Sequence, residues 1–230
     1  MSLKAQKEKV IFAWASDTGK VRQTNEDYFG NYENDFFLVA DGLGGHPAGE
    51  VASKLAVEEA LKAYLKIKKL GEEQEILRRT FSAANKKVFK EAIKLNNLGM
   101  GTTLVAALVS ENKVFIGNVG DSRAYLFNKR GLRQVTTDQE ETVFGWLLQA
   151  VGIEKDLKPD FYEENFGKGD LLLLSTDGLT DQVPDEKIFA ILKNTGKTKE
   201  DLQEKCQELL EAANEVGGMD NATVGLIKYT

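Results

Sequence analysis

The feature that most constrains this chain is a repeated pattern in which a run of apolar residues leads to an aspartate. FFLVADGLGGH places Asp41 directly after five apolar residues, and Asp121 and Asp177 follow the runs in VFIGNVGD and LLLLSTDG. In GGMDNATVGLI, Asp220 comes just before another such run. A carboxylate at the end of a buried strand is costly unless a positive partner meets it. The pattern therefore predicts strands that gather negative charge at one edge.

Each of these positions taken alone is also typical of a turn, because Asp-Gly is common turn chemistry. Asp35 and Asp170, which precede strands after polar loops, are interpreted in that way. The series as a whole favours a cation, since carboxylates gathered at one rim raise one another's pKa values unless a positive ion lies among them. Oxygen ligands without imidazole or thiolate suit Mg²⁺ or Mn²⁺. Calcium is less favoured, because the chain has no EF-hand loop.

Composition argues against several other classes of site. One histidine, His46, and one cysteine, Cys206, cannot assemble a His/Cys zinc site. A formal net charge of -6 disfavours a nucleic-acid partner. The lone cysteine fits a reducing compartment, and it shares a helical stripe with leucines, so we expect a core thiol in a cytoplasmic protein. No apolar run approaches the roughly 18 residues of a membrane span, so we expect no membrane segment and no signal peptide.

The periodicity of apolar residues predicts an α+β chain with residues 1–9 as an N-terminal tail and 10–230 as one domain. Two helix pairs and enough strands for two sheets predict a sheet-on-sheet core with helices outside. The strands between residues 103 and 135 are expected to form one antiparallel meander. The predicted strands are 10–15, 36–40, 103–109, 114–119, 123–127, 132–135, 161–165, 171–175 and 222–229. The predicted helices are 48–70, 72–95, 142–150, 185–193 and 198–216.

A second acidic segment brings an arginine with it. RQTNEDYF carries Glu26 and Asp27, with Arg22 four positions before Glu26. Alone, Arg22 is typical of a surface ion pair, but beside metal ions its planar guanidinium suits a phosphate dianion. Gly42 lets the backbone approach closely, so its carbonyl is a candidate metal ligand beside Asp41. Carboxylates, hard metal ions and an arginine together indicate phosphate-ester hydrolysis by metal-bound hydroxide.

Six segments, in this order, resemble the metal-dependent protein phosphatases, the type 2C serine/threonine phosphatases, and in particular the compact bacterial members. The resemblance covers about residues 10–229. It implies an αββα four-layer sandwich, two antiparallel sheets flanked by helix pairs, with a binuclear Mn²⁺ or Mg²⁺ centre in a cleft at one edge. The segments are GKVRQTNEDYF, FLVADGLGGHPAGEVAS, MGTTLVAALV, IGNVGDSRAYLF, LLLLSTDGLTDQV and MDNATVGLI.

The resemblance also implies a role for each candidate residue. Water activated between two metals would attack phosphorus directly, with no phosphoenzyme, while Arg22 neutralises the phosphate oxygens. His46 is assigned a structural or supporting role. The implied metal-site residues are Asp41 as the bridging carboxylate, the Gly42 carbonyl at the first metal, Asp177 and Asp220 at the second, Glu26 and Asp27 as holders of metal-bound waters, and Asp121 with Asp177 at a third metal found in bacterial relatives.

One segment departs from the family pattern. Bacterial relatives carry a longer flap with an Asp-His-Ser stretch, whereas TTDQEETVFGWLLQAVG is shorter and has Gln139 where histidine is usual. This leaves substrate selection and the third metal open. The apolar flap residues have two interpretations: they tuck into the core, or they contact a partner, a substrate or a second copy through residues 144–148. These residues are Val143, Phe144, Trp146, Leu147 and Leu148.

The leading function is hydrolysis of phosphoserine or phosphothreonine on proteins, since every residue that two-metal chemistry requires is present. The expected partners are phosphorylated proteins and a cognate serine/threonine kinase. One alternative is a regulatory phosphatase for a phosphorylated partner of the anti-sigma-antagonist type. The other is a metal-dependent phosphoprotein-binding module without useful catalysis.

Overall fold

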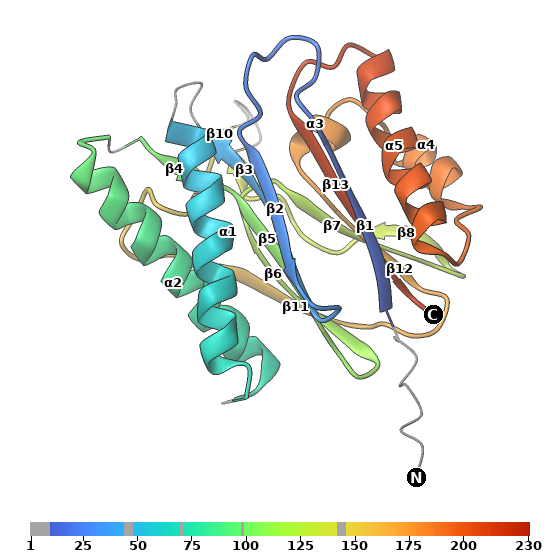
Figure 1. Cartoon of the computed structure of the whole chain (residues 1–230), viewed down its shortest axis with the longest axis horizontal. Coiled ribbons are helices and arrows are strands. Elements are labelled where there is room, and N and C mark those ends of the chain that lie inside the picture. The colour runs from blue at the N-terminus through green and yellow to red at the C-terminus, as the bar shows by residue number, and fades with distance from the viewer. Residues whose placement is uncertain (1–9, 44–47, 70, 98, 142–145) are drawn as a thin grey trace.

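Two antiparallel β-sheets face each other, and helices cover the outer face of each sheet (Figure 1). The computed structural model describes residues 10–43, 48–69, 71–97, 99–141 and 146–230. The predicted N-terminal tail, His46, Val143 and Phe144 lie outside these ranges. The arrangement confirms the α+β class and the four-layer αββα sandwich expected from the sequence.

The first sheet has the strand order β11-β6-β5-β3-β2, and the short strand β4 pairs with β3. Helices α1 (Ala48–Ile67) and α2 (Glu73–Lys94) pack on its outer face (Figure 1). The strands of this sheet are β2 (Asp27–Tyr32), β3 (Phe36–Leu43), β4 (Gly101–Thr102), β5 (Leu104–Ser110), β6 (Lys113–Val119) and β11 (Asp160–Asn165).

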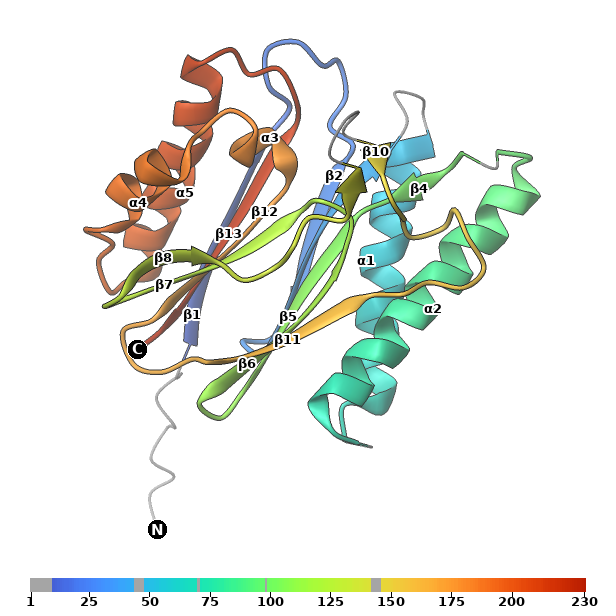
Figure 2. The same ribbon diagram turned by 180° about the vertical axis from the view of Figure 1, so that it is seen from behind.

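The second sheet has the order β1-β13-β12-β7-β8. Its outer face is covered by α4 (Asp185–Leu192) and α5 (Lys199–Glu215), and the short helix α3 (Asp177–Thr180) follows β12 (Figure 2). A capping box between Thr198 and Asp201 begins α5. The strands are β1 (Val10–Asp17), β7 (Arg123–Asn128), β8 (Gly131–Gln134), β12 (Leu171–Ser175) and β13 (Ala222–Tyr229).

Strand β3 is buried on both faces, which explains its unbroken apolar sequence. Phe36 and Leu38 pack toward the helices α1 and α2. Phe37 and Val39 belong to a separate cluster between the two sheets. A strand buried on both sides needs no polar alternation. The layered core thus carries β3 straight to Asp41 at the sheet edge.

Cys206 is fully buried in the cluster between the second sheet and its helices, as the sequence predicted. Burial raises the pKa of its thiol to about 12. A thiol in that environment is inert rather than nucleophilic.

The predicted meander over residues 103–135 is wrong. Strands β5 and β6 pair in the first sheet, whereas β7 and β8 pair in the second, so the chain crosses between sheets after β6. Gly120 makes this crossing with φ of 99°, where a Cβ would lie 2.7 Å from a methyl of Thr103. Two adjacent apolar runs look like a hairpin in sequence, but this turn changes sheets and leaves Asp121 between them.

The predicted helix over residues 142–150 is also wrong across its described part. Trp146 and Leu147 form strand β10 (Trp146–Leu147), which pairs with β9 (Glu140–Glu141). The apolar residues in this segment are consecutive, and consecutive residues cannot share one helix face. Strand β2 and helix α3 were not predicted, because DYFGNY is rich in polar residues and α3 is a single turn. None of the helices in the described ranges is long and apolar enough to cross a membrane.

Candidate metal centre

An acidic pocket of about 430 Å³ opens at the edge where strand ends of both sheets meet. Five carboxylates line it together with Arg22 and Gly42, and these carboxylates are Glu26, Asp41, Asp121, Asp177 and Asp220. Every site residue predicted from the sequence therefore lies at this pocket except Asp27. Asp27 is buried beside the pocket, directly opposite Asp41 in the pairing of β2 with β3.

Thr102, the last residue of β4, and Thr103, directly after it, hold the backbone of Asp41 in place. Thr102 Oγ1 donates a 2.6 Å hydrogen bond to the Asp41 carbonyl, and the Thr103 amide donates another at 2.9 Å. The Asp41 amide donates to Thr103 Oγ1 at 2.9 Å. The hydroxyl of Thr103 lies 2.7 Å from that of Ser122, next to Asp121. The positions of Asp41 and Asp121 are thus coupled through buried hydroxyl groups.

Asp27 and Asp177 each carry a buried oxygen without a hydrogen-bond partner. Thr176 Oγ1 donates a 2.9 Å hydrogen bond to Asp27 Oδ2, but Asp27 Oδ1 has no partner. Asp177 Oδ1 is unpartnered in the same way. Buried polar atoms are rarely left unsatisfied, so each such oxygen calls for an ion or a water molecule.

The pKa values of these acids are raised because the carboxyl groups are buried and because their negative charges repel one another. Burial raises the pKa of Asp41 well above its ordinary value, and the charges of Asp27 and Asp177 raise it further. Burial is also the main cause that raises the pKa of Asp27 and of Asp121 to about 7. Burial also raises the pKa of the Asp177 carboxyl, and the charges of Asp181 and Asp220 raise it further. A divalent cation among these groups would take the place of the proton they share.

The residues present fit a hard divalent cation. All the candidate donors are oxygens, and none of the described lining residues is a histidine or cysteine. A Cβ at Gly42 would collide with the carbonyl of Gly49, so only glycine fits beside Asp41. As they stand, no three acidic, histidine or cysteine side chains in the described ranges are arranged to hold one ion. One reason is that Asp220 is turned toward Arg22.

Arg22 Nη2 lies 2.6 Å from Asp220 Oδ2, and both side chains are partly exposed at the pocket rim. The simpler interpretation of Arg22, a surface ion pair, is therefore also present in the structure. The partner of Arg22 in this pair, Asp220, is one of the predicted metal ligands. Arg22 and Asp220 both line the pocket.

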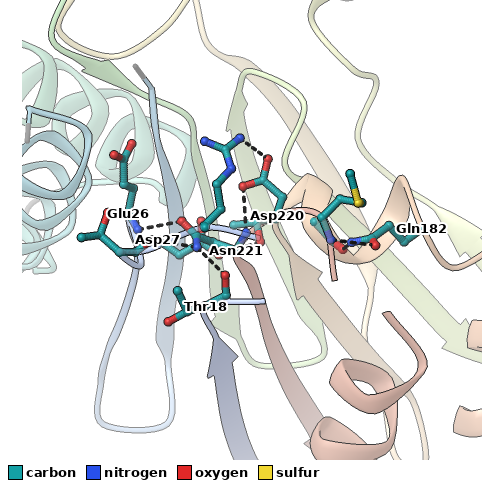
Figure 3. Close-up of polar contacts among 11 residues, drawn as sticks. Thr18, Glu26, Asp27, Gln182, Asp220 and Asn221 are labelled. Carbon is teal, nitrogen blue, oxygen red and sulfur yellow. Dashed lines mark hydrogen bonds and ion pairs between the residues drawn. The ribbon is translucent and has the colours of Figure 1, made fainter. Parts of the chain in front are cut away.

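Asn221 is a site residue that the sequence reasoning missed (Figure 3). Its Oδ1 accepts a 2.8 Å hydrogen bond from the Glu26 amide, and its Nδ2 donates to the carbonyls of Thr18 and Thr24 at 2.9 Å each. The side chain ties the loop that carries Arg22 to the start of β13. The feature of the sequence that could have identified Asn221 is its position directly after Asp220, where a buried side-chain amide can form hydrogen bonds with backbone groups.

Gln139, at the position where histidine is usual, holds the turn before Asp121. Its Oε1 accepts from the Gly120 amide and from Gln149 Nε2 at 3.0 Å each. Its Nε2 donates to Asp160 Oδ2 at 2.7 Å. The amide thus joins the crossing turn, the flap and strand β11, and a neutral imidazole has too few polar atoms to make all three contacts.

The flap presents apolar side chains to the outside. Trp146 is 71% exposed and Leu148 is 66% exposed, so the interpretation that these residues tuck into the core is wrong for both. Trp146 and Leu147 line the acidic pocket. These two residues therefore form an apolar part of the pocket wall.

An αββα sandwich with an arginine and a pocket of oxygen donors at one edge is the combination expected of a metal-dependent protein phosphatase. A model of the family Protein phosphatase 2C matches residues 18–221. The chain belongs to the protein phosphatase 2C family. The family and the enzyme class expected from the sequence, a serine/threonine protein phosphatase, are thereby confirmed.

Relatives and solved structures agree with this assignment. The chain is 38% identical to the serine/threonine phosphatase stp of Listeria monocytogenes, over 93% of each chain. It is 30% identical to the protein phosphatase PhpP of Streptococcus pneumoniae, over 92% of this chain and 94% of that one. A structure of the PstP catalytic domain with two manganese ions has a TM-score of 0.84 and 31% identity, covering 95% of this chain and 97% of that one.

Proposed function

We propose that this protein hydrolyses phosphoserine and phosphothreonine on proteins with water activated at a pair of Mn²⁺ or Mg²⁺ ions. The observation that carries the proposal is the convergence of five carboxylates and Arg22 on one pocket of about 430 Å³. The PstP structure with two manganese ions supports the metal and its stoichiometry.

The pocket residues divide the work between holding metal and binding phosphate. A bound pair of divalent cations would supply Lewis acidity and lower the pKa of water. Asp41 would help to hold both ions, Asp177 and Asp220 would hold one of them, and the Gly42 carbonyl would hold the other. Glu26 would accept a hydrogen bond from water in the pocket, and Asp27, whose Oδ1 has no partner in the structure, would accept one from water beside it. A third position beside Asp121 and Asp177 is supported by their shared wall of the pocket.

Arg22 would bind two phosphate oxygens with its fork of N–H donors and offset the charge that grows on them. To do so it must exchange its present partner, Asp220, for the phosphate. The exchange is inexpensive, because an exposed ion pair contributes only about 0–1 kcal/mol. Metal binding by Asp220 and phosphate binding by Arg22 would therefore favour each other.

The apolar wall supports a role in substrate contact. Trp146, exposed and lining the pocket, would pack against residues that flank the phosphorylated side chain. A homodimer through residues 144–148 is the competing use of the same surface. Phosphorylated proteins, supplied by a cognate serine/threonine kinase, are the proposed partners, and the single buried cysteine supports a cytoplasmic location.

The test measures hydrolysis of p-nitrophenyl phosphate and of a phosphothreonine peptide with and without Mn²⁺. We expect metal-dependent turnover that falls by about 10³-fold or more in Asp41→Asn and in Asp177→Asn. The matched control is Asp156→Asn, an exposed carboxylate on another part of the surface, which should keep full activity. Tight phosphopeptide binding without turnover would favour the binding-module alternative. Turnover confined to a single phosphorylated regulatory partner would favour the anti-sigma-antagonist alternative.

A further inference from the structure

A second hollow lies at the opposite end of the sandwich from the acidic pocket. Its volume is about 800 Å³, and its lining residues come from the β7–β8 hairpin and from the loop between β11 and β12. Figure 2 shows where these two segments lie in the fold. Strand β7 connects the two sites, because it begins two residues after Asp121 and ends at Asn128, which lines the hollow. Six strand residues span roughly 20 Å, which is the separation of the two sites along β7.

The hollow is basic in a chain that is acidic overall. Its wall carries the cations Lys129, Arg130, Arg133 and Lys168 against only two acids. Both acids already have partners. Glu164 lies 2.9 Å from Arg133, and Asp170 accepts a 2.9 Å hydrogen bond from the Gly167 amide.

The other three cations are uncompensated. In the part of the chain that the structure describes, the side chains of Lys129, Arg130 and Lys168 have neither an ion pair nor a hydrogen bond, and all three are exposed. The formal net charge of the chain is -6, so a local excess of three positive charges around one hollow differs in sign from the net charge of the chain. They raise the local concentration of anions at this end of the sandwich.

The shape of the hollow suits a peptide. Gly131 and Gly169 have positive φ values of 114° and 94°, and no heavy atom lies within 4 Å of a Cβ built on either. Their backbone is therefore open to a ligand. Leu126 and Leu132 add an apolar part to the wall. A peptide with acidic and apolar side chains could contact the cations, the open backbone and the apolar surface together. A polynucleotide would instead need a longer row of basic side chains along its phosphates.

We propose that this basic hollow, defined by Lys129, Arg130 and Lys168, binds an acidic or phosphorylated segment of the protein substrate, away from the phosphate that is hydrolysed. The proposal rests on the proposed function. A separation of roughly 20 Å corresponds to at least about six residues of extended chain. Substrates with an acidic segment beyond that distance from the phosphorylated residue would be bound at both ends and gain affinity without any change in the chemical step.

The test is fluorescence anisotropy with labelled peptides in EDTA, so that turnover cannot interfere. The probes are a glutamate-rich peptide, the same peptide with phosphoserine in place of glutamate, and a single-stranded DNA of equal charge. The variant is Lys129→Glu/Arg130→Glu/Lys168→Glu. The matched control is Lys66→Glu/Lys86→Glu/Lys90→Glu, which makes the same charge change on exposed positions of α1 and α2.

We expect the first triple variant to bind the peptides roughly tenfold more weakly or worse, and the control to lose much less. The glutamate and phosphoserine peptides separate carboxylate recognition from phosphate recognition at the same hollow. With metal restored, the variant should hydrolyse p-nitrophenyl phosphate with unchanged kcat/KM but show a raised KM for a phosphoprotein with a distant acidic segment. If the glutamate triple variant fails to fold, the corresponding glutamine variant serves in its place.

Three results would overturn the proposal: equal losses in the two triple variants, unchanged peptide binding in the first, or binding of the DNA alone. Its failure is distinguishable from failure of the proposed function. Peptide binding by a protein that hydrolyses no phosphate ester would remove the proposed function and leave the hollow as a peptide site. Hydrolysis with unaltered binding in the variant would remove only the hollow.

Discussion

Arg22 and Asp220 are joined by a 2.6 Å ion pair, although they lie 198 positions apart in the sequence. The pair connects the side chain proposed to bind phosphate with one proposed to bind metal. In the proposed mechanism, metal binding by Asp220 and phosphate binding by Arg22 would separate this pair.

The first prediction concerns this pair. Arg22→Ala should raise KM for p-nitrophenyl phosphate by about tenfold and lower kcat less, because we propose that the guanidinium binds the phosphate of the substrate. Arg22→Lys keeps the charge but not the fork, so it should recover only part of the loss. Steady-state kinetics measure both effects. A wild-type KM in Arg22→Ala would contradict the phosphate role, and thermal unfolding should change little, since the pair is exposed.

The second prediction concerns metal removal. The uncompensated acids oppose folding, so Mn²⁺ should raise the thermal midpoint measured in EDTA by several degrees. Asp41→Asn should raise the midpoint in EDTA by relieving repulsion with Asp27 and Asp177, and should abolish the response to Mn²⁺. Calorimetry with and without Mn²⁺ measures both. A variant that lost stability in EDTA but still responded fully to Mn²⁺ would show that Asp41 does not hold the ion.

The third prediction concerns Asn221. Asn221→Ala removes three hydrogen bonds and leaves the Glu26 amide without its acceptor, so the free energy of unfolding should fall by about 2–4 kcal/mol. Asn221→Asp keeps the acceptor but places a carboxylate oxygen against the two carbonyl oxygens and beside the pocket acids, so it should be no more stable than the alanine variant. Urea unfolding measures the change. A loss below about 0.5 kcal/mol would mean that the Arg22 loop is held by other contacts.

The fourth prediction concerns Cys206. Burial raises the pKa of its thiol to about 12 in the folded protein, against an ordinary value of 9.0. The unfolded chain therefore ionises first as the pH rises, and the stability that this thiol contributes is complete below about pH 9 and is lost progressively toward pH 12. At pH 8 the folded protein should not react with a thiol reagent until urea unfolds it. Rapid labelling of the folded protein would contradict the buried position.

The fifth prediction separates the two uses of the flap. Trp146 and Leu148 are both exposed, but Trp146 lines the acidic pocket and Leu148 is absent from its described wall. If the flap contacts substrate, Trp146→Ala should raise KM for a phosphopeptide several-fold and Leu148→Ala should not. If the flap is a dimer interface, both variants should weaken association in sedimentation equilibrium. A monomeric wild type with unchanged kinetics in both variants would exclude both uses.

The sequence was informative where a physical rule acts on neighbouring residues. Apolar runs buried on both faces identified β3 and β12, and helical periodicity identified α1, α2 and α5 within a few residues of their observed ends. Asp121 and Asp177 could be named because an aspartate that closely follows a buried strand lies where the strands end. Asp41 was found by the same rule, although β3 continues to Leu43. Asp177 was found in this way, although it begins a helix that was not predicted.

What the sequence did not reveal depends on contacts between distant segments. The crossing at Gly120 resembles a hairpin turn locally, and only the placement of β7 in the second sheet distinguishes the two. Asn221 and Gln139 form hydrogen bonds with groups far away in the chain, which no local pattern predicts. The basic hollow forms where two loops, separated by more than thirty residues, come together, and its lysines look ordinary in each loop alone.

The pocket draws its acids from both sheets, and this has a mechanical consequence. Asp27 and Asp41 belong to the first sheet, whereas Asp177 and Asp220 adjoin strands of the second. The distance between these two pairs of acids therefore depends on the apolar core between the sheets, to which Phe37 contributes. A smaller side chain in this core would therefore change the distance between the carboxylates of the two sheets, although the substitution lies outside the pocket.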